Sequence, residues 1–464
     1  MGQPVREYLL TLCVTAAVAY LLTGPVRKFA IAAGAMPEIR ARDVHREPTP
    51  RLGGIAMFGG LCAGLLVASH LTNLKSVFEN SAEPRALLSG AALIWVLGVL
   101  DDKWGVDALV KLGGQMIAAA VMVLQGLTIL WIPIPGVGNV SLSPWQGTLL
   151  TVALVVITIN AVNFVDGLDG LASGMVCIAA AAFFMYTYRM WFGYGIEAAA
   201  PATLFSVVLM GMCLGFLPHN MHPARIFMGD SGSMLIGLVL AAGAVSVTGQ
   251  VDPDLLNQKA GGLREAVHAM VPVYIPLLLP LTVIAVPIAD LVLAVVRRTW
   301  NGQSPFAADR GHLHHRLLEI GHSHSRAVLI MYFWSALIAF GAVAYSVNNA
   351  SVWVVLLIVL LSAIGLVLLL LPRFRPRAPR WAEWMVPPRY RRRRVTPAAS
   401  GAAERAEDAG ETGEDAAVPE PAGAGAPGRA SGAAREPVPA GLHGATAIGD
   451  RSRFPARGGA GTHR

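Results

Sequence analysis

Charged residues are scarce in this 464-residue chain: Asp, Glu, Lys and Arg make up 14 % of it, whereas 54 % of the residues are hydrophobic. A soluble domain has no use for so many apolar runs, so the composition indicates a protein that crosses a membrane several times. Cysteine is scarce too, and the positions of the cysteines indicate small buried side chains and imply no disulfide framework. Each of the four lies inside an apolar run: Cys13, Cys62, Cys177 and Cys213.

Two further features are missing. We find no convincing internal repeat, which argues against a transporter built from inverted halves. The first apolar run, Tyr8 to Thr23, lacks a convincing small-residue cleavage site and is followed by a basic loop. We therefore expect a retained span there and not a cleaved signal peptide.

The apolar runs predict an all-α polytopic membrane protein with about eleven transmembrane helices, because each run has about the length that a bilayer core requires. Prolines in the ninth run predict a kinked or broken helix. The expected spans are residues 8–24, 53–72, 86–100, 112–132, 147–163, 169–188, 202–218, 231–249, 269–296, 327–347 and 351–371.

Lys and Arg gather in alternate loops. Loops 25–52 and 297–326 are rich in Arg, whereas loop 133–146 contains no Lys, no Arg and no other ionisable side chain. Cytoplasmic loops carry the excess of Lys and Arg. We therefore predict that the N-terminus lies outside, that the C-terminus lies inside, and that the basic loops face the cytoplasm.

The composition changes after the last span. We predict a transmembrane domain over residues 1–371 and a basic juxtamembrane segment over 372–395 that could lie against anionic headgroups. Residues 396–464 are rich in Ala, Gly, Pro and Glu and poor in large apolar side chains. Such a segment cannot repay the entropy of ordering, so we expect a disordered low-complexity cytoplasmic tail.

The polar stretch NAVNFVDGLDG, residues 160–170, follows a long apolar run. If the helix continues, its Asn and Asp side chains lie roughly on one helical face. Such side chains are costly at a membrane unless a cation or hydrogen-bonding group meets them. The alternative is ordinary helix capping, since Asn or Asp followed by Gly often ends a helix. The side chains in question are Asn160, Asn163, Asp166 and Asp169.

Four other polar clusters fall on the same predicted side of the membrane, which favours a site over mere helix ends. Carboxylate and amide oxygens suit Mg²⁺ or Mn²⁺, and nearby cations would neutralise phosphate charge. The set therefore predicts phosphoryl transfer at the cytoplasmic surface. The clusters are HREPTPRLGG (45–54), DDKWGVDALVK (101–111), PARIFMGDSGS (223–233) and ADRGHLHHRL (308–317).

Each cluster has a simpler interpretation. Asp101 and Asp102 could be a solvated pair, and Asp230 or Ser231 could cap a helix. The three histidines at 312, 314 and 315 could bind zinc, although no HExxH helix or cysteine pair accompanies them.

Taken together, PTPRLGG, DD with a lysine nine residues on, NAVNFVDGLDGLASG, ARIFMGDSGS and PFAADRGHLHHRLL closely resemble the polyprenyl-phosphate N-acetylhexosamine-1-phosphate transferases, the WecA, TagO and MraY family. The resemblance covers about residues 8–371 in the family's order. It implies transfer of a sugar-1-phosphate from a UDP-sugar to polyprenyl phosphate at the cytoplasmic face, releasing UMP, with Mg²⁺ or Mn²⁺.

The resemblance also implies residue roles. Asp230 would bind the metal with Asn163 as second ligand, and Asp101 and Asp102 would form the acidic pair that orients or deprotonates the lipid phosphate. Lys111 would contact phosphate. The remaining matches are to the nucleotide pocket and to the loop over the diphosphate and sugar: Arg46, Asp166, Gly167, Leu168, Asp169 and Phe227 for the first, and Arg310, His312, His314 and His315 for the second.

Leu313 interrupts the three consecutive histidines typical of the MraY branch, so the chain looks like the WecA and TagO branch, which favours UDP-GlcNAc. We expect one-step displacement, with a two-step route through an aspartyl-phosphate left open. The alternatives are an MraY-like phospho-MurNAc-pentapeptide transferase, a CDP-alcohol phosphotransferase and an ion-coupled transporter. We expect a multi-pass protein of the cell membrane, no nucleic-acid partner, and allow a homodimer.

Overall fold

The computed structural model describes residues 5–36, 49–134, 138–250, 324–347 and 352–370. The chain divides into two units, Met1–Arg375 and Pro376–Arg464, and every described residue lies in the first. Several predictions fall outside the described residues: the ninth span, the juxtamembrane segment and tail, Arg46, Arg310, His312, His314 and His315.

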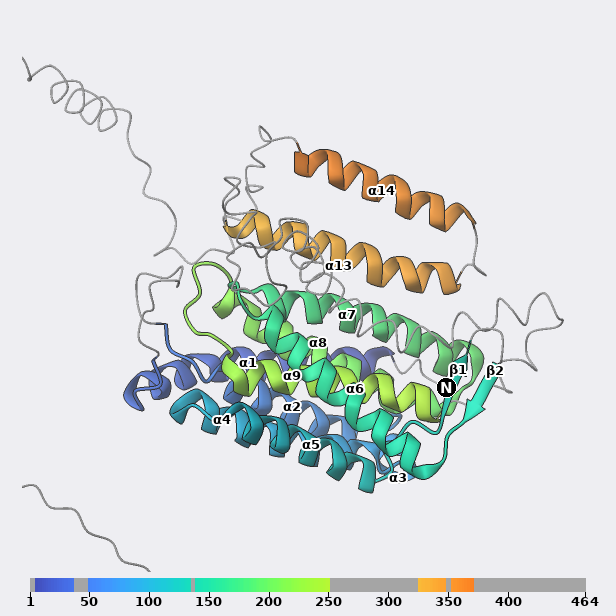
Figure 1. Cartoon of the computed structure of the whole chain (residues 1–464), viewed down its shortest axis with the longest axis horizontal. Coiled ribbons are helices and arrows are strands. Elements are labelled where there is room, and N and C mark those ends of the chain that lie inside the picture. The colour runs from blue at the N-terminus through green and yellow to red at the C-terminus, as the bar shows by residue number, and fades with distance from the viewer. Residues whose placement is uncertain (1–4, 37–48, 135–137, 251–323, 348–351, 371–464) are drawn as a thin grey trace, which may run out of the picture. The chain divides into compact units, whose positions relative to one another are not determined.

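The described part of the chain is almost entirely helical (Figure 1). Its elements are α1 (Val5–Ala32), α2 (Gly53–His70), α3 (Lys75–Asn80), α4 (Glu83–Trp104), α5 (Ala108–Leu124), β1 (Trp131–Ile134), β2 (Gly138–Ser141), α6 (Pro144–Val165), α7 (Leu171–Tyr188), a π turn (Arg189–Gly193), a 3-10 turn (Glu197–Ala199), α8 (Ala200–Asn220), α9 (Gly229–Gln250), α13 (His324–Val347) and α14 (Val352–Leu370).

Eight of the described helices are long and apolar enough to cross a membrane, judged by length and composition. They are α1, α2, α4, α6, α7 with its π turn, α8 with the preceding 3-10 turn, α9 and α13. A helix also lies on each of the other two predicted spans within the described ranges, α5 and α14. The prediction of an α-helical, multi-pass membrane protein is therefore confirmed, whereas the count of eleven spans and their orientation stay predictions.

Some predicted boundaries are wrong. The span expected over 112–132 ends at Leu124, because Gly126 adopts φ 96° and turns the chain out of the helix. The chain then enters β1, which pairs antiparallel with β2. Helix α1, in contrast, is longer than expected. It continues through Pro25 to Ala32 instead of ending at residue 24, because membrane helices tolerate an internal proline. Helix α3 lies in an expected loop.

The stretch 160–170 is not one continuous helix. Helix α6 ends at Val165, and Gly170 adopts φ 75° directly before α7 begins at Leu171. Asp-Gly pairs favour turns, and a glycine in the left-handed region reverses the chain without strain. Asp166 and Asp169 therefore lie in a tight turn, which we call the α6–α7 turn and define as residues 166–170.

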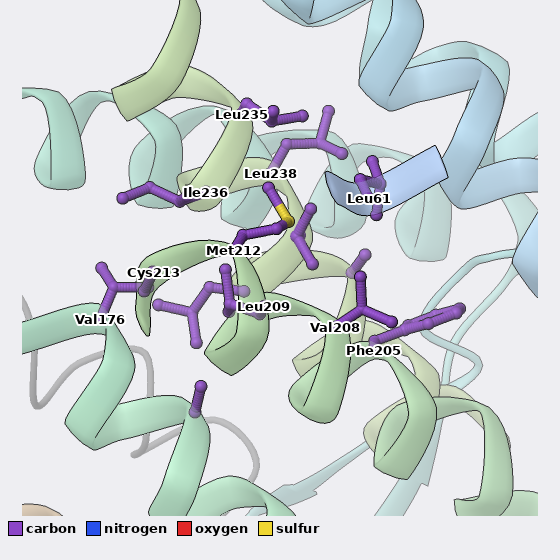
Figure 2. Packing of buried hydrophobic residues seen from close by; sticks show 14 of the residues in the cluster. Leu61, Val176, Phe205, Val208, Leu209, Met212, Cys213, Leu235, Ile236 and Leu238 are labelled. Atoms are coloured by element: carbon purple, nitrogen blue, oxygen red, sulfur yellow. The ribbon is translucent and has the colours of Figure 1, made fainter. Parts of the chain in front are cut away.

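Helix α9 is the centre of the described bundle. An 18-residue apolar stretch of α9 is wholly buried, whereas the equivalent stretch of α1 is 28 % buried. Helices α2, α4, α6 and α8 surround α9, while α13 packs on α7 and α14 on α13 (Figure 1). Leu61 of α2, Phe205 and Met212 of α8, and Leu238 of α9 belong to the shared core (Figure 2). Residues on α9 are therefore held from several sides.

Small residues let the helices approach closely near one end of α9. A Cβ added at Gly98 of α4 would lie 2.3 Å from Ser231 Cα, and one at Gly54 of α2 would lie 2.4 Å from Gly232 N. Close backbone contact at glycines is a main source of helix association in membranes, where lipid competes for apolar side chains. It brings the ends of α2 and α4 against the first turn of α9.

Candidate active site

Four of the five polar clusters meet at the N-terminal end of α9. The 49–54 segment lies against the residues that precede α9: Phe227 N donates to Pro50 O at 2.9 Å, and Gly54 N donates to Met228 O at 2.9 Å. Phe227 itself is partly exposed beside this segment. The fifth cluster, 308–317, lies outside the described residues.

Asp102, at the end of α4, accepts hydrogen bonds from the start of α9. Its carboxylate accepts from Asp230 N at 2.8 Å, from Ser231 N at 3.0 Å and from Ser231 Oγ at 2.6 Å. The first N–H groups of a helix have no partner within the helix, and a negative charge there also suits the helix dipole. The capping that we considered for Asp230 or Ser231 is thus supplied by Asp102 from another helix.

Gly229 makes room for this contact. It adopts φ 69°, and a Cβ there would lie 2.4 Å from both carboxylate oxygens of Asp102. Any side chain at this position would meet both backbone strain and a direct clash. The close approach of α4 to α9 therefore explains why the first residue of the GDSGS motif is a glycine.

Lys111 connects the other two acidic residues. Its Nζ lies 2.7 Å from Asp101 Oδ2 and also pairs with Asp230 Oδ2. Asp101 Oδ1 accepts from Val106 N at 2.8 Å, which fixes the carboxylate at the bend between α4 and α5. The side chains of Asp101, Lys111 and Asp230 are 12 %, 24 % and 27 % exposed, so the cluster is shielded yet reachable from solvent. We call these three residues the ion cluster.

The α6–α7 turn contributes a further carboxylate. Asp166 keeps partial exposure, but burial together with the charges of Asp230 and Asp102 raises the pKa of its side chain to about 7. A carboxyl that resists ionisation beside other carboxylates marks a place where a cation would be stabilised.

The two asparagines at the end of α6 point to different neighbours. Asn163 Nδ2 donates to Ser233 Oγ of α9 at 3.0 Å, so Asn163 faces the first turns of α9. Asn160 Nδ2 donates to Gln115 Oε1 of α5 at 2.6 Å. Asn160 therefore helps to join α5 to α6, whereas Asn163 is placed toward the helix that carries Asp230.

The rest of the turn is held by residues that the motifs did not single out. Asp169 is 3 % exposed, and its carboxylate accepts from Ala224 N at 3.1 Å and lies 2.8 Å from His222 Nδ1. Asp169 N donates to His324 Nε2 at 3.1 Å. Leu168 is buried, whereas Gly167 is exposed. His222 directly precedes the PARIFMGDSGS motif, and only proximity in the fold reveals its partner.

Asp169, His222 and His324 offer ligand atoms that all lie within 4.8 Å of one another. Two imidazoles and a carboxylate are a donor set that suits Zn²⁺ and related ions. However, the three residues are already hydrogen-bonded among themselves, and the two imidazole rings are stacked 4.4 Å apart at 18°. Two stacked rings do not direct their nitrogens at a common ion, so the geometry favours a hydrogen-bonded network.

Comparison with known proteins gives a consistent result. Residues 85–248 match the family model described as Glycosyl transferase family 4. The decaprenyl-phosphate N-acetylglucosaminephosphotransferase of Mycobacterium tuberculosis (strain H37Rv) is 48 % identical over 344 residues, which are 74 % of this chain and 83 % of the relative. The probable undecaprenyl-phosphate N-acetylglucosaminyl 1-phosphate transferase of Bacillus subtilis is 33 % identical, over 73 % of this chain and 84 % of the relative.

A more distant relative carries the same type of name. The undecaprenyl-phosphate alpha-N-acetylglucosaminyl 1-phosphate transferase of Escherichia coli (strain K12) is 27 % identical over 72 % of this chain and 83 % of its own length. The region that matches the family model, residues 85–248, contains all three residues of the ion cluster. This chain therefore belongs to the family of polyprenyl-phosphate N-acetylglucosamine-1-phosphate transferases, within Glycosyl transferase family 4.

Proposed function

We propose that this protein transfers GlcNAc-1-phosphate from UDP-GlcNAc to a polyprenyl phosphate, decaprenyl or undecaprenyl, and releases UMP. The product would start a lipid-linked cell-envelope glycan. The observation that carries the proposal is the ion cluster of Asp101, Lys111 and Asp230, set beside the α6–α7 turn in a chain of this family.

The reaction needs groups that hold phosphates more than it needs a strong base. The attacking lipid phosphate oxygen forms a bond to the phosphorus that carries GlcNAc, and the bond from that phosphorus to the UMP oxygen breaks. A phosphate monoester has a second pKa of about 6, so the attacking group is largely dianionic at pH 7. Catalysis then consists mainly of bringing two anions together and stabilising their charge.

Each residue of the site has a place in that scheme. Lys111 already sits between two carboxylates, and its ammonium would turn to a phosphate as substrate enters. Asp101 would orient the lipid phosphate next to Lys111. Asp102 is engaged with the first turn of α9, so in this scheme it would hold Asp230 in position and would not act as a free base. This changes the role that we expected for Asp102 from the motifs.

The residues also fit a divalent cation. Asp230, Asn163 and Asp166 lie at or beside the first turns of α9, where burial and the charges of Asp230 and Asp102 together raise the pKa of Asp166. Asp230 would hold Mg²⁺ or Mn²⁺ with Asn163 as a second ligand, since oxygen donors suit both ions. When bound, the ion would neutralise charge on the diphosphate. Arg46, Arg310, His312, His314 and His315 remain proposed substrate contacts.

The placement in the cell is also part of the proposal. Arg-rich segments flank this end of the bundle in the sequence, which supports a cytoplasmic site in the cell membrane. The outside position of the N-terminus follows from the same rule. A homodimer stays a prediction.

The test is a transfer assay with the purified full chain in detergent. We expect UMP and labelled GlcNAc-phospholipid to form in equal amounts from UDP-GlcNAc and decaprenyl phosphate, and both to disappear when EDTA is added. Parallel reactions use UDP-GalNAc, the UDP-MurNAc-pentapeptide and a CDP-alcohol. Faster transfer from the muramyl nucleotide, or UMP release without added lipid, would contradict the proposal.

A further inference from the structure

We propose that Asn220, His222, His324 and Tyr332 are positioning residues that hold the α6–α7 turn at the distance from the ion cluster that nucleotide binding requires. We call these four residues the turn clamp. The inference rests on the proposed function, because it assigns the turn to the UDP-sugar. None of the four residues touches the ion cluster in the described structure, so their effect would pass through the turn.

The turn clamp first fixes the backbone of the turn. Asp169 N donates to His324 Nε2 at 3.1 Å, and Gly170 N donates to Asn220 Oδ1 at 3.1 Å. The Tyr332 hydroxyl donates to Gly170 O. These N–H groups precede the start of α7 and have no partner within that helix. Residues from the end of α8 and from α13 therefore supply the bonds that the turn cannot make for itself.

The turn clamp then fixes the buried carboxylate of the turn. Asp169 is buried, and its carboxylate accepts a hydrogen bond from His222 Nδ1, while the His222 side chain is 38 % exposed. An exposed imidazole that pairs with a buried carboxylate sits at the boundary between the packed bundle and solvent. Burying that charge without a partner would be costly.

The hydrogen bonds also assign the histidine tautomers. His324 Nε2 accepts the proton of Asp169 N, so the His324 proton lies on Nδ1. His222 Nδ1 must carry a proton to donate to the Asp169 carboxylate. Substitutions can reproduce these roles separately: an asparagine at 222 keeps a donor near Nδ1, and a glutamine at 324 keeps an acceptor near Nε2.

The position of the turn matters because its other side faces the site. Asn163, three residues before the turn, donates to Ser233 Oγ of α9 at 3.0 Å, and Asp169 of the turn accepts from Ala224 N, which lies in the segment that leads into Asp230. Gly167 of the turn is exposed. A turn that loosens would move these residues relative to the ion cluster without changing the cluster. Nucleotide binding should therefore weaken, whereas binding of the lipid phosphate should not.

The test compares His222→Ala with His222→Asn in the full chain. We expect His222→Ala to raise the KM for UDP-GlcNAc by about tenfold, the lower range for losing a hydrogen bond to a charged group. His222→Asn should stay within about twofold of wild type, and the KM for decaprenyl phosphate should stay unchanged in both. Tyr332→Phe, which removes a single hydroxyl, should shift the same KM in the same direction by less, and serves if His222→Ala fails to fold.

Hydrogen exchange gives a readout that does not depend on turnover. The amides of Asp169 and Gly170 should exchange faster in His222→Ala than in wild type, while amides in α9 keep their rates. Equal KM changes for both substrates, or an unaltered KM for UDP-GlcNAc, would overturn the inference. If the purified protein contains stoichiometric zinc, and removing the zinc loosens the turn, a metal site would replace the hydrogen-bonded turn clamp as the explanation. If wild type neither binds nor turns over UDP-GlcNAc, the proposed function fails and the nucleotide role with it, whatever the exchange rates show.

Discussion

The two ends of the α4–α9 pair use the same chemical partners for different purposes. At the site end, Asp102 of α4 accepts from Ser231 of α9, and at the opposite end Glu83 of α4 accepts from Ser246 of α9. Glu83 is 6 % exposed, whereas Asp102 is partly buried. The difference is their surroundings. Asp102 adjoins the ion cluster, whereas within the described ranges Glu83 forms no ion pair.

This comparison teaches how to separate structural from functional acids in the bundle. A carboxyl bonded to one serine hydroxyl joins two helices and can be replaced by a neutral isostere. Asp101 and Asp230, beside Asp102, instead share the ammonium of Lys111. Replacing either of these carboxylates by a neutral group removes a charge that the cluster is built around, so the loss of activity should be larger. Both kinds of acid lie at the ends of apolar helices. Their role therefore depends on which side chains surround them and not on where they lie along the helix.

Apart from the loss of transfer expected for Asp230→Asn, the largest effect is expected for Asp101→Asn. It keeps the shape of the side chain but removes one of the two charges that hold Lys111, so kcat/KM should fall by about 10²- to 10³-fold, as when a preorganised electrostatic contact is lost. The assay is transfer of labelled GlcNAc-1-phosphate. The matched control is Asp107→Asn, since Asp107 caps α5 by accepting from Leu109 N and asparagine caps equally well. Similar losses in both variants would contradict the assignment.

Lys111→Met should reduce transfer by about 10- to 100-fold, because Asp101 and Asp230 lose the cation between them and phosphate loses a contact. Lys103→Met is the control: Lys103 lies at the end of the same helix α4 but rests over the Trp104 ring at 4.6 Å. Kinetics at saturating Mg²⁺ compare the two. An equal response of both lysines would mean that only the net charge near the membrane matters.

Asp102→Ala should lower the free energy of unfolding by about 1–2 kcal/mol, the usual cost of removing a helix cap, and lower transfer by about tenfold because Asp230 loses its fixed position. Asp102→Asn should lie between Ala and wild type in both properties. Thermal unfolding in detergent and the transfer assay measure them. A Tm loss with full activity would show that the cap does not position Asp230.

Gly98→Ala tests the close approach of α4 to α9. The added methyl would meet Ser231 Cα, so we expect a loss of about 1–3 kcal/mol, as for overpacking of a filled core. Gly113→Ala in α5 is the control, because a Cβ there meets nothing within 4 Å, and alanine in a helix should gain up to about 1 kcal/mol. Thermal unfolding of both variants decides. Equal Tm shifts would remove the steric argument for the α4–α9 contact.

The helices were the most predictable part of the molecule. Long apolar runs must form helices in a membrane, since every backbone polar group needs a partner within its own segment. The common predicted side of the membrane and the family resemblance also placed Asp101, Lys111 and Asp230 in one region. The direction in which each side chain points could not be predicted. The motif alone allows Asp102 to face solvent, substrate or a helix end, and it is the close approach of α4 to α9 at Gly98 that places Asp102 against α9.

The partners of Asp169 show a second limit of sequence reasoning. His324 meets the Asp169 amide from 155 positions away, and no local pattern records such a contact. The break in the helix after Val165 was likewise one of two alternatives, because Asp-Gly pairs occur both in turns and at helix ends. The hairpin of β1 and β2 was also missed: its first two residues lie in a run that was expected to be helical, and the rest lies in a segment that was expected to be a loop.

The most direct test of the account is a side-by-side transfer assay of Asp230→Asn and Glu83→Gln, prepared identically and matched for folded protein by Tm. The account predicts that Asp230→Asn loses transfer of GlcNAc-1-phosphate to decaprenyl phosphate, because its charge belongs to the ion cluster, whereas Glu83→Gln retains it. Transfer that survives in Asp230→Asn, or that is lost equally in Glu83→Gln, would contradict the claim that the site lies at the N-terminal end of α9.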